Sequence, residues 1–156
     1  MPDMLVNLYQ LPENEEAMPE GVRIKRAMAP DTGRIMEWIE EKFSAGWAHE
    51  CQKVLFNTPA SCFLAVKDQK IIGFACYDAT ALGYFGPIGV DPDCRKGGIG
   101  AALTRRCLLA MREKGYGYAI IGWVGPQEFY KKVCGAQLIE GSSAPQTVYG
   151  NMIRVD

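Results

Sequence analysis

The chain has 156 residues, of which 48% are hydrophobic and 22% are charged, and its formal net charge is −1. This composition suits one globular domain with a buried core and argues against intrinsic disorder. The near-neutral charge provides no general basic excess for binding nucleic acid or an anionic membrane. No apolar run reaches the ~20 residues that a membrane span needs, and residues 1–10 lack the basic start of a signal peptide. We therefore expect a cytoplasmic protein.

The first half of the chain predicts two strands followed by two helices. Residues 4–11 form a short strand candidate, and the acidic, proline-containing residues 12–21 predict a linker. Apolar alternation predicts a strand over residues 22–28. Asp31 is a candidate N-cap for a helix with apolar residues at helical spacing. A second helix is expected over residues 47–55.

The middle of the chain predicts a hairpin, a third strand and a long helix. The hairpin joins residues 62–67 to residues 71–77, and the third strand covers residues 82–90. Pro87 lies inside that strand and marks a bulge, an edge or a gap, because proline cannot donate to a β-ladder. Apolar residues recur every four positions over residues 98–114, which is the clearest helix pattern in the sequence.

The remaining elements complete an α/β fold. A continuous apolar strand is expected over residues 118–123 and a short helix over residues 126–133. Two further strand candidates cover residues 137–140 and 147–153. This order predicts one domain over residues 1–156, in which a strand or arm (1–20) precedes a core (21–156) with a mixed sheet and helices on both faces.

Cysteine usage favours free thiols over a metal or disulfide framework. The six cysteines include no Cys-x-x-Cys pair, and the single histidine, His49, has no metal-ligand spacing around it. Reduced thiols in a cytosolic protein are the simpler explanation. We expect no bound metal.

A phosphate-binding loop is predicted where the third strand leads into the long helix. Arg95 and Lys96 stand directly before three glycines, Gly97, Gly98 and Gly100, at the start of that helix. A helix N-terminus offers unpaired N–H groups and partial positive charge, and glycines let phosphate oxygens approach them. The spacing matches neither a Walker loop nor a Rossmann turn. The alternative is a glycine-rich turn without a ligand.

The run Val90-Asp91-Pro92 followed by Arg95-x-x-Gly98-x-Gly100-Ala101 resembles the acyl-CoA pyrophosphate motif of the GNAT superfamily of N-acetyltransferases, Arg/Gln-x-x-Gly-x-Gly/Ala. The resemblance extends over the predicted element order and implies a GNAT-like, central, splayed sheet with acetyl-CoA as co-substrate. It implies that the pyrophosphate is held by Arg95, Lys96, Gly97, Gly98, Ile99, Gly100 and Ala101. It also implies that the pantetheine pairs with the backbone of Ile88, Gly89 and Val90. One departure is the order Lys96-Gly97, where the family often has glycine before lysine.

The same resemblance gives Pro87 and Tyr130 specific functions. In this family the strand before the motif carries a bulge and splays from the next parallel strand, and Pro87 falls at about that place. Phe129-Tyr130 resembles the segment whose tyrosine protonates the leaving thiolate. Gly135 follows Tyr130 by five residues, where four is usual in the family. The alternatives are an ordinary strand irregularity and a packed tyrosine.

The general base is less well defined by the sequence. Candidates are Glu50, His49, Asp78 and Tyr84, and we choose Glu50 because it shares a helix face with Trp47 near the expected acceptor site. Each could instead be structural or solvated, and a water chain could take the proton. A backbone N–H near Ile88 is the expected oxyanion donor.

Two functions follow from these features. The first is an N-acetyltransferase that transfers an acetyl group from acetyl-CoA to a primary amine by direct attack in a ternary complex. The second is a catalytically inactive acyl-CoA sensor or interaction module, which the unusual spacing after Tyr130 keeps open. The acceptor, a small molecule or a peptide amine, is not defined by the sequence. We expect no nucleic-acid or membrane partner, and a homodimer is among the states that the sequence allows.

Overall fold

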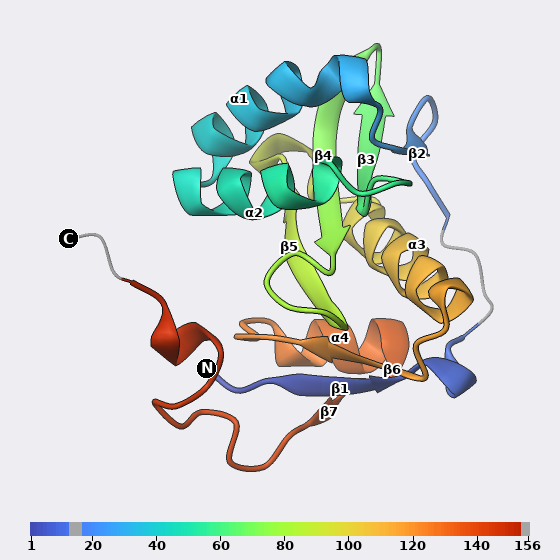
Figure 1. The fold of residues 1–156 in the computed structure, drawn as a ribbon. Helices are drawn as coiled ribbons and strands as arrows, with labels where there is room; N and C mark the ends of the chain where they lie inside the picture. Colours follow the sequence, from blue (N-terminus) through green and yellow to red (C-terminus); the bar gives the residue numbers. More distant parts are fainter. Residues whose placement is uncertain (13–16, 154–156) are drawn as a thin grey trace.

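The computed structural model describes residues 1–12 and 17–153, which form a central sheet with helices on both faces (Figure 1). The seven described strands follow the order β2-β3-β4-β5-β6-β1-β7. Neighbours pair antiparallel except β5 and β6, which run parallel. The strands are β1 (Met4–Asn7), β2 (Arg23–Arg26), β3 (Cys62–Lys67), β4 (Lys70–Tyr77), β5 (Tyr84–Val90), β6 (Tyr118–Ile121) and β7 (Gln137–Leu138). The predicted mixed α/β fold is confirmed.

Strand alternation divides the core into two layers. In β3, Phe63 and Ala65 belong to one cluster of buried residues, while Cys62 and Leu64 belong to the other. The first cluster includes residues of α3 (Ile99–Lys114) and α4 (Gln127–Cys134). The second includes residues of α1 (Thr32–Lys42) and α2 (Ala45–Leu55). Each face of the sheet is therefore covered by one pair of helices.

Strands β5 and β6 separate soon after they meet, which opens the sheet in its middle. They pair only at Tyr84 with Ile120 and at Phe85 with Ile121, although β5 continues to Val90. The register between β4 and β5 shifts opposite Gly86 and Pro87. The predicted irregularity at Pro87 is therefore a bulge, and the remainder of β5 has an edge that β6 does not cover.

The N-terminal strand is shorter than predicted and lies far along the sheet from β2. Residues 4–11 were expected to be extended, but the strand ends at Asn7, whose side chain caps the 3-10 turn Leu8–Gln10. β1 lies between β6 and β7 and pairs with both. The N-terminal segment therefore completes the sheet beside the opening.

The prediction of a strand over residues 147–153 is wrong. Tyr149–Asn151 form a 3-10 turn, and the preceding residues are turns and bends. The position between β6 and β7 is taken by β1, and β7 itself pairs over only two residues. The C-terminal segment crosses toward α2 instead, where Tyr149 hydrogen-bonds Thr80.

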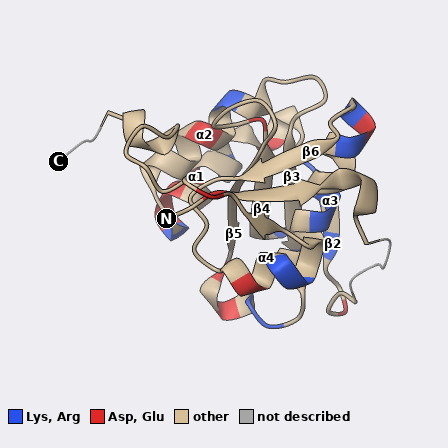
Figure 2. Cartoon of the chain, turned by 90° about the horizontal axis from the view of Figure 1, so that it is seen from below, with Lys and Arg blue, Asp and Glu red and all other residues tan. Residues whose placement is uncertain are grey.

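Charged side chains of both signs are interspersed over the molecule. Figure 2 shows lysine and arginine on several elements, among them α3 and α4, with acidic residues between them. In the part of the chain that the structure describes, no helix combines the length and apolarity that a bilayer crossing requires.

Candidate active site

Glycines at the start of α3 adopt backbone conformations that other residues rarely adopt. Gly97 and Gly98 have φ angles of +134° and +82°. A Cβ on Gly97 would lie 2.7 Å from Cγ of Pro19, and one on Gly98 would lie 3.2 Å from the Ala17 carbonyl oxygen. The loop therefore requires glycine for both conformation and space. This leaves the first amides of α3 uncovered by side chains from these positions, as an anion site needs.

Arg95 is held beside this loop at the end of β5. Its Nε donates a hydrogen bond to the Val90 carbonyl oxygen at 3.3 Å, and its side chain is exposed. Lys96 is exposed as well. Two cations and a helix N-terminus therefore meet at one end of the β5–β6 opening, which is favourable for a diphosphate.

The uncovered edge of β5 presents backbone groups to the opening. The Asp91 N–H donates to the Ile72 carbonyl oxygen on β4 at 2.8 Å. Because polar groups alternate along a strand, those of Ile88 and Val90 point to the opposite side, away from β4. β6 does not pair with these residues. The Val90 carbonyl oxygen already accepts the hydrogen bond from Arg95 Nε, whereas the outward backbone groups of Ile88 are available to an extended ligand in the manner of an added strand.

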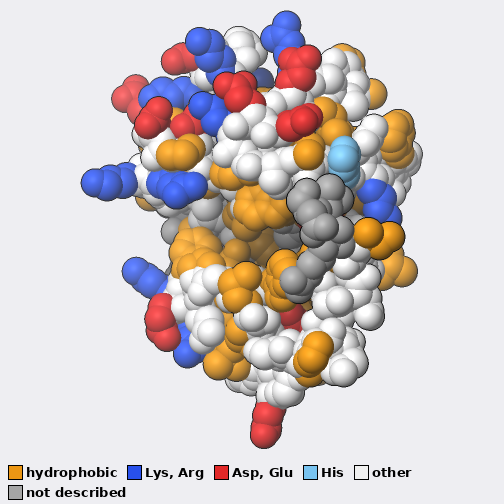
Figure 3. Space-filling view, turned by 90° about the vertical axis from the view of Figure 1, so that its left-hand side faces the viewer, with side chains coloured by type: hydrophobic (Ala, Val, Ile, Leu, Met, Phe, Trp, Pro, Cys, Tyr) orange, Lys and Arg blue, Asp and Glu red, His pale blue; other side chains and the backbone are white. Residues whose placement is uncertain are grey.

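One cavity of about 940 Å³ connects the loop with the opening. It lies on the face seen in Figure 3, where hydrophobic side chains gather in a hollow below a more charged surface. The predicted residues that line it are Glu50, Ile88, Gly89, Val90, Arg95, Gly98, Gly100, Ala101 and Tyr130. Lys96, Gly97 and Ile99 belong to the same loop but do not line the cavity.

Tyr130 lines the cavity from α4 and is almost entirely buried. Its ring packs edge-on against Phe85 and Phe129, with ring centroids 6.2 Å and 5.0 Å away. Burial raises the pKa of the Tyr130 phenol well above its usual value. The hydroxyl therefore stays protonated at physiological pH and can donate a hydrogen bond.

The long spacing between Tyr130 and Gly135 is accommodated at the end of α4. The helix continues to Cys134, and Gly135 has a φ of +66°. The Gly135 N–H donates to the Lys131 carbonyl oxygen, which is the 5→1 bond of an αL cap, and the Ala136 N–H donates to the Tyr130 carbonyl oxygen. The extra residue lengthens the helix end and leaves Tyr130 facing the cavity.

Of the four candidate bases, only Glu50 lines the cavity. It lies on α2, and its Oε1 accepts a hydrogen bond from the Thr80 hydroxyl. His49 is exposed on the same helix, and Tyr84 lies outside the cavity lining. Thr80 Oγ1 lies 3.1 Å from the Tyr149 hydroxyl. Three distant segments of the chain thus meet at one carboxylate.

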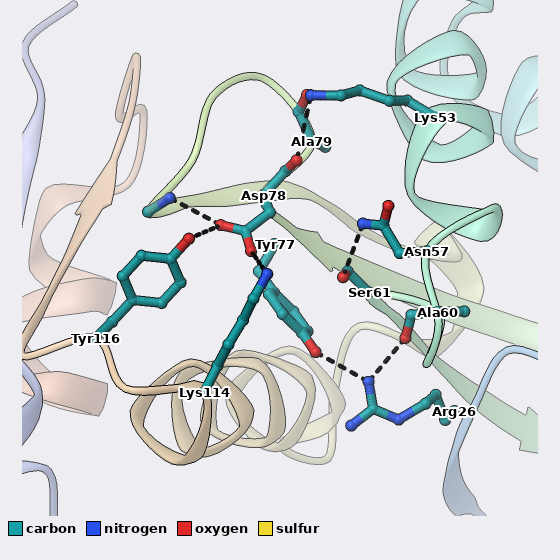
Figure 4. Close-up of polar contacts among 11 residues, drawn as sticks. Arg26, Lys53, Asn57, Ala60, Ser61, Tyr77, Asp78, Ala79, Lys114 and Tyr116 are labelled. Carbon is teal, nitrogen blue, oxygen red and sulfur yellow. Dashed lines mark hydrogen bonds and ion pairs between the residues drawn. The ribbon is translucent and has the colours of Figure 1, made fainter.

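Asp78, another candidate base, has a structural function instead. Its carboxylate accepts hydrogen bonds from Lys114 Nζ at 2.7 Å, the Gly83 N–H at 2.8 Å and the Tyr116 hydroxyl at 2.9 Å (Figure 4). Burial alone would raise the pKa of Asp78, but these hydrogen bonds and the Lys114 charge hold it below its usual value. The carboxylate fastens the β4–β5 loop to the end of α3.

The sequence reasoning missed Thr80 and Tyr149, and the structure brings Tyr149 against Trp123. The Trp123 ring stacks on Tyr149, with centroids 5.0 Å apart and planes 12° from parallel. Trp123 has a φ of +53°, and its backbone N–H donates a hydrogen bond to Asp3 Oδ1 at 3.0 Å. No local pattern marks these residues, since their relation depends on contacts between both ends of the chain.

A cluster of three thiols also appears only in three dimensions. The Sγ atoms of Cys51, Cys62 and Cys76 all lie within 4.8 Å of one another in the core under α2. All three cysteines are free and buried. Cys62 and Cys76 are direct cross-strand partners, whereas Cys51 comes from the helix. Sequence spacing gave no sign of this grouping.

The family comparison supports an acetyltransferase. Residues 32–136, about two-thirds of the chain, match the model of the acetyltransferase (GNAT) family. No curated protein matches the chain in sequence.

Solved structures of the same fold are similar to this chain at low identity. A GCN5-related N-acetyltransferase from Sphaerobacter thermophilus superposes with a TM-score of 0.70 and 22% identity, over 88% of this chain and 48% of that one. The glucosamine N-acetyltransferase region of a fungal multi-domain GH3 β-N-acetylglucosaminidase gives 0.70 and 13%, over 88% and 19%. A GNAT family acetyltransferase from Brucella melitensis, in complex with acetyl-CoA, gives 0.56 and 18%, over 76% and 86%. The chain thus spans half or less of the length of the first two.

Proposed function

Because the chain belongs to the GNAT family of acetyltransferases, we propose that it transfers an acetyl group from acetyl-CoA to a primary amine by direct attack in a ternary complex. The observation that supports this proposal is the single cavity that runs from the α3 loop to Tyr130 and Glu50. An anion site, an uncovered strand edge, a phenol and a carboxylate lie along that one cavity. Together they correspond to the requirements of acyl transfer from a thioester.

The cofactor-binding assignment divides between two segments. The amides of residues 96–101 and the Arg95 guanidinium would hold the pyrophosphate, and the backbone of Ile88, Gly89 and Val90 would pair with the pantetheine arm. Gly89 also has a steric reason to lack a side chain, because a Cβ there would lie 2.5 Å from Cζ of Phe43. Phe43 thereby packs directly over the face of β5 at Gly89, beside the edge on which the arm would lie.

The bond changes assign one function to each polar group. The amine nitrogen forms a bond to the thioester carbonyl carbon while the carbon–sulfur bond breaks, so the products are an amide and a thiol. A backbone N–H of β5 at Ile88 would stabilise the developing oxyanion. The Tyr130 hydroxyl would donate a hydrogen bond, and in the end a proton, to the leaving sulfur. The Glu50 carboxylate would receive the proton that the amine loses.

The proposal is tested by following thiol release from acetyl-CoA with the full chain over a panel of primary amines, with mass spectrometry of the products. We expect amine-dependent release, and Tyr130→Phe should lower kcat by ~10²-fold or more, in the range of general acid catalysis. Tyr118→Phe is the matched control, since Tyr118 is 54% exposed and lies at the end of β6 that does not line the cavity. Both variants should retain the melting temperature.

A different result would favour the acyl-CoA binding module. If no amine stimulates thiol release while CoA still raises the melting temperature, the transferase proposal is wrong. Ligand at 100 times Kd stabilises a folded protein by ~2.7 kcal/mol, which such a measurement resolves easily.

A further inference from the structure

We propose that the acceptor is a small primary amine with a single positive charge on an apolar, aromatic body, and that its ammonium group binds between Glu50 and Tyr149. This inference rests on the proposed acyl transfer and adds the class of acceptor. It follows from the charges, the hydrogen-bond directions and the aromatic walls at the end of the cavity that Glu50, Trp123 and Tyr149 share.

The charge at this end of the cavity calls for a cation. Among the described residues, Glu50 is the only acidic side chain that lines the cavity and Arg95 beside the α3 loop is the only basic side chain, while Met1, which carries the α-amino group, lines the cavity as well. Glu50 forms no ion pair within the described part of the chain. A partly buried carboxylate without a cationic partner in a mainly apolar cavity is costly. A ligand ammonium would supply the missing charge.

The hydrogen bonds around Glu50 indicate a primary ammonium in particular. The single Thr80 hydroxyl hydrogen is donated to Glu50. The Tyr149 hydroxyl lies 3.1 Å from the same Thr80 oxygen, so Tyr149 is the donor in that contact. Its own oxygen then retains lone pairs for a further donor. Two acceptors, a carboxylate and a phenol oxygen, are therefore available to the three N–H groups of one ammonium.

The walls around these acceptors are aromatic. The Trp123 and Tyr149 rings stack nearly parallel, and Trp47 and Phe43 form a second aromatic pair with centroids 5.3 Å apart. All four side chains line the cavity. Aromatic faces favour both flat apolar groups and a nearby cation. A saturated polyhydroxylated body would leave its hydroxyl groups without partners on these walls.

The Trp123 position is constrained in a way that points to function. A left-handed backbone is a rare and strained conformation for a bulky residue, and it is kept here by the hydrogen bond to Asp3. A Cβ at Gly122 would overlap the Tyr149 ring, so the adjacent glycine is needed for that ring to lie against the chain. The structure thus holds an indole, 39% exposed, at the rim of the cavity rather than in the core.

The experiment compares four amines with acetyl-CoA and the full chain under steady-state conditions. The four are 2-phenylethylamine, phenylalanine, glucosamine and spermidine. Phenylalanine adds only a carboxylate to 2-phenylethylamine, glucosamine replaces the aromatic body, and spermidine adds positive charges. We expect kcat/KM for 2-phenylethylamine to exceed kcat/KM for each of the other three amines by at least about tenfold. The loss of one cation–π or ion-pair contact lowers binding by about this factor.

Variants separate the charge from the ring. Glu50→Gln and Tyr149→Phe should each raise KM for 2-phenylethylamine, because the first removes the negative charge and the second removes the phenol oxygen that would accept from the ammonium. Glu50→Gln should also lower kcat, because Glu50 is the proposed general base. Tyr149→Ala should raise KM further by removing the ring as well. Glu41→Gln is the matched control for loss of a carboxylate, since Glu41 is exposed on α1 and outside the cavity lining, and it should leave KM unchanged.

Two results would overturn the inference, and they are distinguishable. If glucosamine, phenylalanine or spermidine is the better substrate, the acceptor class is wrong while the transferase proposal stands. If none of the four amines nor any other primary amine is acetylated, although acetyl-CoA raises the melting temperature, the transferase proposal fails and the acceptor class fails with it.

Discussion

Gly98 shows how a single backbone angle can decide ligand binding at the residue scale. Replacing it with alanine would place a Cβ at a φ of +82° and 3.2 Å from the Ala17 carbonyl oxygen. Left-handed geometry costs an L-residue roughly 1–2 kcal/mol, so we expect the loop to shift and the CoA affinity to fall. Gly115→Ala is the control, because Gly115 also has a positive φ but follows the far end of α3. Isothermal titration with CoA should show weakened binding for Gly98→Ala alone.

Also at the residue scale, Asp78 makes the free energy of unfolding depend on pH. A carboxyl whose pKa is lowered on folding stabilises the protein above its unfolded pKa of ~3.9, and that stabilisation is lost as pH falls through the lower folded value. We expect the free energy of unfolding to decrease as pH falls below about 4. Asp78→Asn should remove this part of the pH dependence and cost about 1–3 kcal/mol at neutral pH. Urea denaturation at several pH values measures the loss of stability and its pH dependence. If Asp78→Asn loses stability below pH ~4 as the parent protein does, Asp78 is not the group responsible.

At the scale of elements, β1 links the two segments that form the acceptor end of the cavity. Asp3, directly before β1, accepts the Trp123 N–H and donates its own N–H to Ser142 Oγ at 2.8 Å. It thereby fastens the end of β6 to the C-terminal segment. A short strand that pairs with both β6 and β7 is well placed for this task.

Asp3 is therefore a positioning residue for Trp123, and its substitution should change acceptor binding. We expect Asp3→Ala to raise KM for the amine by several-fold, with a smaller effect on kcat. Asp3→Asn should restore KM because its side-chain oxygen can still accept the Trp123 N–H. Steady-state kinetics of the two variants check this. Equal losses in both, or a loss confined to kcat, would show that Asp3 does not act through Trp123.

For the whole molecule, burial separates the six cysteines into two groups. Cys94, beside the α3 loop, is partly exposed, whereas the other five are buried. We expect a thiol reagent to label one cysteine quickly in the native protein, and CoA to slow this labelling. Mass spectrometry of the labelled peptides identifies the site, and Cys94→Ser should abolish the fast phase. Fast labelling of any cysteine in the cluster of Cys51, Cys62 and Cys76 would mean that the core under α2 opens readily.

The sequence by itself determined the order of most elements and the α3 loop. Helical and strand periodicities are local, and so is a run of cations and glycines between a strand and a helix. The bulge at Pro87 was foreseeable for the same reason, since proline removes a donor wherever it stands in a strand. Only short or weakly patterned segments, such as residues 8–11 and 147–153, were assigned wrongly.

Tertiary structure alone decided how the acceptor end of the cavity is built. Glu50 was chosen from the sequence for its helix face, but only the structure shows that it alone of the four candidates lines the cavity. Its partner Thr80 lies 30 residues from Glu50 in the chain and 69 residues from Tyr149. The position of β1 between β6 and β7 and the cluster of three thiols depend in the same way on strand order and register. Contacts between such distant residues leave no periodic pattern, because they arise from packing of complete elements rather than from neighbouring residues.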